Sequence, residues 1–192
     1  MNRITRKLEQ GFTMIEIAVV LMMGGVIVSF AAPRITSAMR TYRVNIAMRQ
    51  VTDTLKRVKM QAVSENRRAA LVVDTANRQT GMAILNDDGT VKDTYYVPLP
   101  QGIIFERPST PTNPAGVPSS LTGAVSFSKY GNSGSVYKQD FSARGFPVVA
   151  SGSDMVCIFI GNGKDYRAVT MSSVGGIHLY RLEGTTWKDT RY

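Results

Sequence analysis

The stretch Lys7-Leu8-Glu9-Gln10-Gly11-Phe12-Thr13-Met14-Ile15-Glu16 decides the fold of this 192-residue chain. It joins a short basic leader to an apolar run that continues from Phe12 to Ala32 and whose only ionisable side chain is Glu16. At a rise of about 1.5 Å per residue, a helix over this run is about 30 Å long, which is the hydrocarbon thickness of a bilayer. The run therefore predicts a helix that spans a membrane.

The acid inside this run is a functional signal, because a charge near the bilayer centre costs about 2.5–3.5 kcal/mol on insertion scales. An ordinary secretory signal peptide has an apolar region of about 7–15 residues and no acid within it. That alternative and an uncut membrane anchor remain open but are less favoured. Basic residues lie on both sides of the run, and we expect the leader to stay in the cytoplasm because it meets the insertion machinery first.

The Gly11-Phe12 junction followed by Glu16 resembles the class III leader of type IV pilins and type II secretion pseudopilins. The resemblance implies that a prepilin peptidase cuts between Gly11 and Phe12 and methylates the new amino terminus of Phe12. It also implies that Glu16 sets axial register by pairing with the Phe12 amine of a neighbouring subunit, which relieves two buried charges. The alternative is that Glu16 only extends to the membrane interface.

Apolar residues at spacings of three and four continue beyond the membrane segment, so we expect one helix from about Phe12 to about Asn66. Gly24 and Gly25 weaken it, and Pro33 should kink it because proline cannot donate to the Ser29 carbonyl. In the pilin family the stretch between such glycines and the proline can lose helicity in the fibre. Close helix packing in the bilayer is an equal alternative for the glycines.

Positive charge is concentrated on the second half of this helix. The chain carries a net charge of +9, and residues 34–68 hold nine basic and two acidic side chains. A solvated face is the plainest interpretation, and attraction to anionic lipid head groups is a second. Nucleic acid is a third and disfavoured one, because Tyr42 is the one aromatic residue among these basic side chains and gives little support for stacking on single strands. The weak candidate anion-binding residues are Arg40, Arg43, Lys56, Arg57 and Lys59.

The rest of the chain predicts short strands separated by turn residues, with 155–160 as a central strand and a proline-rich surface loop at 108–120. The expected fold class is α+β: a long N-terminal helix, transmembrane in its first half, packed against an antiparallel β-sheet head. The expected parts are a leader (1–11), a transmembrane or fibre-core helix (12–32), an amphipathic half-helix (33–68) and a β-rich head (69–192). Strands are expected at 69–74, 82–85, 94–97, 103–105, 125–127, 146–149, 155–160, 167–171 and 177–182.

A second resemblance lies in the C-terminal third. The segment Phe141-Ser142-Ala143-Arg144-Gly145-Phe146-Pro147, followed by a buried strand and Arg167-Ala168-Val169-Thr170-Met171 before a glycine turn, is similar to the GspH/FimT group of minor pseudopilins and pilins. DNA-binding members of that group carry a Gly-Arg-x-Arg motif near the last strand. The matching place here is Gly175-Gly176-Ile177-His178, without arginine, which argues against DNA binding through that motif.

Catalytic chemistry finds no support in the sequence. Cys157 and His178 are the only residues of their types, so neither an intrachain disulfide nor a two-histidine metal site can form within the chain. No phosphate-binding loop or nucleophile elbow occurs, and we expect no enzyme activity, metal or cofactor.

The expectation is a minor pilin or pseudopilin of the bacterial inner membrane with its head in the periplasm. It would be assembled into, or cap, a type II secretion pseudopilus or a type IV pilus. The implied partners are the prepilin peptidase, other pilins or pseudopilins and the inner-membrane assembly platform. The alternative is a ligand-binding subunit at a pilus tip, with DNA or a secreted protein as the ligand.

Overall fold

The computed structural model describes residues 12–86, 88–109, 112–117, 123–127, 134–148 and 155–190. The chain divides into two compact units, Met1–Met39, called the anchor unit below, and Arg40–Tyr192, called the head unit. The described residues form one long helix, which runs through both units, and eight strands. These are α1 (Met14–Ser64), β1 (Ala69–Asp74), β2 (Gln79–Leu85), β3 (Val91–Pro98), β4 (Val136–Phe141), β5 (Met155–Gly161), β6 (Tyr166–Ser172), β7 (Ile177–Glu183) and β8 (Thr186–Asp189).

The helix predicted from Phe12 to Asn66 is confirmed within two residues at each end. Its C-terminal end has a specific cause. Asn66 adopts a left-handed φ of 50°, the N–H of Arg67 donates to the Ala62 carbonyl at 3.1 Å, and the N–H of Asn66 donates to Val63 at 3.2 Å. This pair of bonds is a Schellman motif, which satisfies the last carbonyls and ends the helix.

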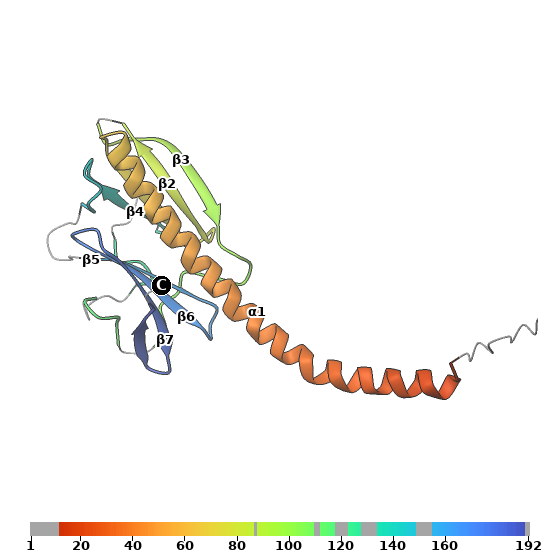
Figure 1. Cartoon of the computed structure of the whole chain (residues 1–192). Coiled ribbons are helices and arrows are strands. Elements are labelled where there is room, and N and C mark those ends of the chain that lie inside the picture. The colour runs from red at the N-terminus through yellow and green to blue at the C-terminus, as the bar shows by residue number, and fades with distance from the viewer. Residues whose placement is uncertain are drawn as a thin grey trace, which may run out of the picture. The chain divides into compact units, whose positions relative to one another are not determined.

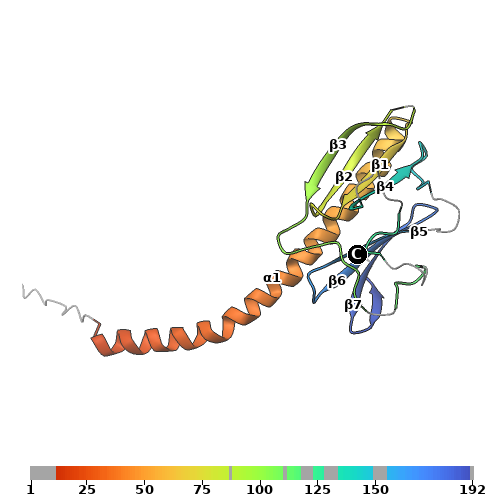
Figure 2. The ribbon, with the colours of Figure 1, turned by 180° about the vertical axis from the view of Figure 1, so that it is seen from behind.

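Two antiparallel four-stranded sheets form the head unit, in the orders β3-β2-β1-β4 and β5-β6-β7-β8, where the sequence suggested one sheet. Both contribute to one core together with the second half of α1 (Figures 1 and 2). Helix residues at spacings of three and four are almost fully buried in that core, which confirms the α+β class. They are Val44, Ala47, Met48, Val51, Leu55, Val58 and Ala62.

Strands β1 and β5 are apolar on both faces, and each face packs into a different cluster. Leu71 of β1 and Ile158 of β5 join the core under α1. Ala70 packs with Ala83 and Leu85 in a second cluster. Cys157 lies in a third, beside Phe159, Ala168 and Tyr180. Such strands read as continuous apolar runs in the sequence because successive side chains point to opposite faces.

Cys157 is therefore a small buried apolar residue. It is fully buried, and this burial raises the pKa of its thiol well above the ordinary value. A neutral thiol of this kind is a poor nucleophile.

The prediction that 155–160 is a central strand is wrong, because β5 lies at the end of its sheet order. Its outer side is nevertheless occupied. Ile104 and Gly161 exchange backbone hydrogen bonds at 3.0 Å, and the Phe159 N–H donates to Ala124 at 2.8 Å. The predicted strands 103–105 and 125–127 form only isolated bridges to β5, so they shield its edge without extending the sheet.

Two strands were not predicted, and a third predicted strand, besides 103–105 and 125–127, is reduced to a bridge. β4 has alternating polar residues, including Lys138 and Asp140, and β8 is short and mostly exposed. The segment 146–149 forms only the bridge between Phe141 and Pro147, and Val149 lies outside the described residues. The polar strands lack the apolar runs on which the sequence prediction depended. They form strands because their backbones pair with β1 and with β7, respectively.

Gly145 supports a first prediction about this packing. Its φ is +76°, and a Cβ built there would lie 2.9 Å from Lys59 Cγ and from Val63 Cγ2 on the helix. Gly145→Ala should therefore lose about 2 kcal/mol of unfolding free energy, from the left-handed backbone and from the clash. The measurement is thermal unfolding of the full chain in detergent by circular dichroism.

Gly163→Ala is the matched control for this variant. Gly163 has a similar φ of +81°, but a Cβ there meets nothing within 4 Å. We expect it to lose only about 1 kcal/mol, the backbone term alone. Equal losses for the two variants would show that helix contact at Gly145 has no effect.

Candidate functional site

Thr13 and Glu16 close the N-terminal end of α1. The N–H and the hydroxyl of Thr13 both donate to Oε2 of Glu16 at 2.9 Å, and the Glu16 N–H donates to the Thr13 hydroxyl oxygen at 3.3 Å. This reciprocal arrangement is a capping box, which satisfies backbone donors that have no partner at a helix start. Glu16 therefore has a partner within its own chain. The sequence carried the signal in Thr13-x-x-Glu16, but the prediction did not use it.

The anchor unit exposes a continuous apolar surface. Phe12 is 85% exposed and Met14 92%, and the large apolar residues through Phe30 are exposed as well. Among the described residues, α1 is the one helix that is long and apolar enough to cross a membrane. An exposed apolar surface of this length is compatible with a membrane-spanning segment and is typical of helices that contact lipid or other apolar helices.

Gly24, Gly25 and Pro33 lie inside α1, and the residues on both sides of them remain helical. A Cβ at either glycine would meet nothing within 4 Å, so no contact inside the described chain requires glycine there. The Ser29 hydroxyl donates to the Gly25 carbonyl at 2.8 Å and the Thr36 hydroxyl to the Pro33 carbonyl at 2.9 Å. These bonds bracket the helical turn in which Pro33 supplies no N–H.

The five basic residues predicted as anion-binding candidates are not brought together. The Lys59 ammonium donates to the Gly175 carbonyl at 3.3 Å, so this side chain contacts the β6–β7 turn. Lys56 lines a groove of about 680 Å³ beside β7, and Arg57 lines one of about 470 Å³ beside β2 and β3. Arg40 and Arg43 remain as a pair in one small pocket.

That pocket has a volume of about 190 Å³ and collects residues from three separate segments. Arg40 and Arg43 come from α1, and Lys164 comes from the β5–β6 turn. No local sequence pattern predicts that Lys164 lines the same pocket as the two arginines, because this arrangement depends on how a distant hairpin packs beside the helix. The remaining lining residues are Gln101, Gly102, Ile103 and Asn162.

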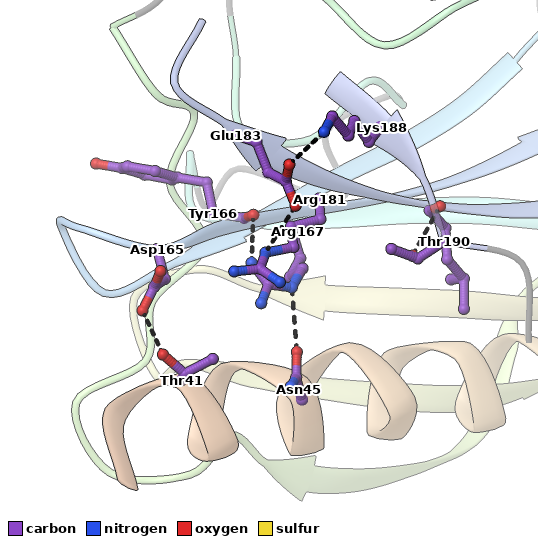
Figure 3. Close-up of polar contacts among 10 residues, drawn as sticks. Thr41, Asn45, Asp165, Tyr166, Arg167, Arg181, Glu183, Lys188 and Thr190 are labelled. Atoms are coloured by element: carbon purple, nitrogen blue, oxygen red, sulfur yellow. Dashed lines mark hydrogen bonds and ion pairs between the residues drawn. The ribbon is translucent and has the colours of Figure 1, made fainter. Parts of the chain in front are cut away.

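A polar network fastens β6 to α1 inside the head unit (Figure 3). The Thr41 hydroxyl donates to Asp165 Oδ2 at 2.9 Å, and Arg167 Nε donates to Asn45 Oδ1 at 3.1 Å. The spacing explains the match, since residues four apart on a helix and two apart on a strand are both separated by about 6–7 Å along the element. Arg167 is only 2% exposed and also donates to the Tyr166 carbonyl at 2.9 Å.

Glu183 lies next to this network. Lys188 approaches its carboxylate at 2.6 Å and Arg181 at 3.8 Å. The hydrogen bond and charge of Lys188, with smaller effects of Arg181 and Arg167, hold the pKa of Glu183 below its ordinary value. Arg167 pairs directly across the strands with Arg181, so this carboxylate offsets two neighbouring positive charges.

Comparisons of the chain with protein-family models, with curated proteins and with solved structures find no match. Residues 1–11, and with them Gly11 and the leader, lie outside the described residues. The candidate features fall into two separate groups: the exposed apolar surface and the Thr13–Glu16 cap belong to the anchor unit, and the basic pocket belongs to the head unit.

Proposed function

We propose that the chain is a membrane-anchored subunit of a helical fibre, held in lipid by the first half of α1 before assembly and by neighbouring helices after it. More specifically, we propose a minor pilin or pseudopilin of a type IV pilus or a type II secretion system, cut between Gly11 and Phe12 and N-methylated at Phe12. The prepilin peptidase, other pilins or pseudopilins and the inner-membrane assembly platform are its partners in this proposal, and the head lies in the periplasm.

The observation that carries this proposal is the exposed apolar helix with a single acid at its start. Phe12 to Ala32 finds no partner surface among the described residues, while one face of the second half of α1 is buried in the core that both sheets share. A helix with these two different halves is suited to joining a lipid or fibre core to a folded head.

The geometry of Glu16 is compatible with a role in register. Both hydrogen bonds to its carboxylate reach the same oxygen, Oε2. Among the described residues Oε1 has no hydrogen-bond partner, so it is available to a cation. Glu16 could thus cap its own helix through one oxygen and accept the Phe12 amine of a neighbouring subunit through the other, and a subunit in the wrong axial position would leave both charges unpaired.

Intact-mass spectrometry of the chain purified from membranes tests the proposal. We expect a mature chain that begins at Phe12 and carries one added methyl group. A Gly11→Val variant, which places a branched side chain at the cut, should keep the full-length mass. A wild-type chain that begins at any other residue, or that keeps its leader, would contradict the proposal.

A further inference from the structure

We propose that the pocket formed by Arg40, Arg43 and Lys164 binds the phosphate group of an anionic membrane phospholipid. This inference rests on the membrane anchor in the proposed function. It adds a ligand site in the head unit, at a place where the sequence suggested only a diffuse basic surface.

The charge in the pocket favours an anion. Arg40, Arg43 and Lys164 are all exposed, and in the part of the chain that the structure describes none of their side chains has a hydrogen-bond or ion-pair partner. None of the described residues that line the pocket is acidic. Asp165 follows Lys164 directly, but its Oδ2 accepts the Thr41 hydroxyl. Three like charges around one hollow raise the local positive potential, which a bound phosphate would relieve.

The walls of the pocket are fixed by backbone contacts. Asn162 Oδ1 accepts the N–H groups of Lys164 at 3.0 Å and Asp165 at 2.8 Å, which sets the turn that carries Lys164. In the segment 101–103, which also lines the pocket, the Ile103 N–H donates to the Pro100 carbonyl at 3.1 Å, and the Ile103 side chain is buried. Lys164 is therefore carried by an ordered turn, and Arg40 and Arg43 by α1, so little backbone entropy would be lost on binding.

The size of the pocket selects a small group. Its volume of about 190 Å³ is below the roughly 300–1,000 Å³ of pockets that enclose drug-sized ligands. It corresponds to about six water molecules at roughly 30 Å³ each. A phosphate group and the start of its ester fit this space, with the rest of the ligand outside the head unit.

The position in the chain favours a lipid as the source of that phosphate. Arg40 follows Ala32, the end of the apolar run, by eight residues, which is about 12 Å of helix. Each head-group layer extends about 5–8 Å beyond the hydrocarbon core. An arginine side chain extends several ångströms from its Cα, which is enough to cover the remaining distance from Arg40 to the head-group layer. Lysine and arginine side chains near an anionic membrane surface are also attracted to it.

Nucleic acid is less well supported by the same structure. Binding along a nucleic acid backbone needs a patch or stripe of bases that meets successive phosphates. The basic side chains of α1 instead separate, because Lys59 is bonded to the Gly175 carbonyl and Lys56 and Arg57 line different grooves. One isolated pocket matches one phosphate.

Native mass spectrometry of the full chain in detergent tests the site, with phosphatidylglycerol and phosphatidylcholine as probes. The pocket variant is Arg40→Gln, Arg43→Gln and Lys164→Gln together. The control variant, Lys56→Gln, Arg57→Gln and Lys92→Gln, removes the same charge elsewhere on the head unit. We expect wild type and control to retain one phosphatidylglycerol in preference to phosphatidylcholine, and the pocket variant to bind it roughly tenfold more weakly or worse.

Several outcomes would overturn the inference: no retained phosphatidylglycerol, equal retention of phosphatidylcholine, or equal losses in the two variants, which would mean diffuse attraction. Inorganic phosphate that displaces the lipid at equal concentration would assign the site to free phosphate. Displacement by a DNA duplex at lower concentration would assign it to nucleic acid. Cleavage before Phe12 is measured separately, so failure to bind the lipid would not contradict the proposed function. A chain that keeps its leader but retains phosphatidylglycerol would contradict the proposed function and support the lipid site alone.

Discussion

Replacing Glu16 by alanine is expected to remove the chain from assembled fibres while leaving its amount in the membrane unchanged. Without the carboxylate, the Phe12 amine of a neighbouring subunit would be buried without a partner. An unpaired charge inside an apolar environment costs about 2.5–3.5 kcal/mol on insertion scales, which corresponds to roughly a hundredfold loss of incorporation. The measurement is immunoblotting of sheared fibres against the membrane fraction of the same cells.

The Glu16→Gln variant separates the two roles that the structure gives this side chain. Glutamine at this position still completes a capping box with Thr13, because its amide oxygen accepts the same hydrogen bonds. It carries no charge and cannot neutralise an amine. If register depends on charge, Glu16→Gln should fail as badly as Glu16→Ala.

Thr13→Ala is the matched control for the cap. It removes the hydroxyl that donates to Glu16 and accepts from its N–H, but it keeps the carboxylate. Loss of an N-cap hydroxyl costs about 1 kcal/mol of helix stability, so incorporation should fall only slightly. Normal fibres with Glu16→Gln and defective fibres with Thr13→Ala would show that the acid acts as a helix cap and that charge pairing is unnecessary.

The sequence predicted well where periodicity is local. The limits of α1 follow from apolar spacing and from Asn66, and β1 was predicted at Ala69–Asp74 because all six of its residues favour burial or a following turn. Glu16 was found for its charge, but its partner Thr13 was missed. The pattern Thr13-x-x-Glu16 before an apolar run is the local signal for this pair, because it is typical of a capping box at a helix start.

Other features depend on contacts that no local pattern encodes. β4 is polar at alternate positions and pairs with β1 across more than sixty residues of chain, so only the folded head shows it as a strand. The same holds for Lys164, whose place beside Arg40 results from the packing of the β5–β6 hairpin. Arg167 was assigned to a strand by its neighbours, and nothing in its sequence context indicated that its guanidinium would be buried against the helix.

Arg167→Ala is expected to cause a large loss of stability in the head unit. The side chain is 2% exposed, so truncation leaves a cavity, and the Asn45 and Tyr166 oxygens each lose a charged donor. Together these effects should cost about 3 kcal/mol, which lowers the unfolding midpoint of a unit of this size by roughly 6–12 °C. Thermal unfolding of the full chain in detergent by circular dichroism measures the shift.

Two further variants show which property of Arg167 is responsible. Arg181→Ala removes the arginine directly opposite on β7, which is exposed and lies 3.8 Å from Glu183, and should cost at most about 1 kcal/mol. Arg167→Met fills most of the space but donates no hydrogen bond. A loss of about 1–2 kcal/mol for Arg167→Met would assign the remainder to the cavity. If the unfolding free energy of Arg167→Met equals or exceeds that of wild type, the hydrogen bonds of the buried guanidinium contribute no stability. Packing alone would then hold β6 against α1 at this point.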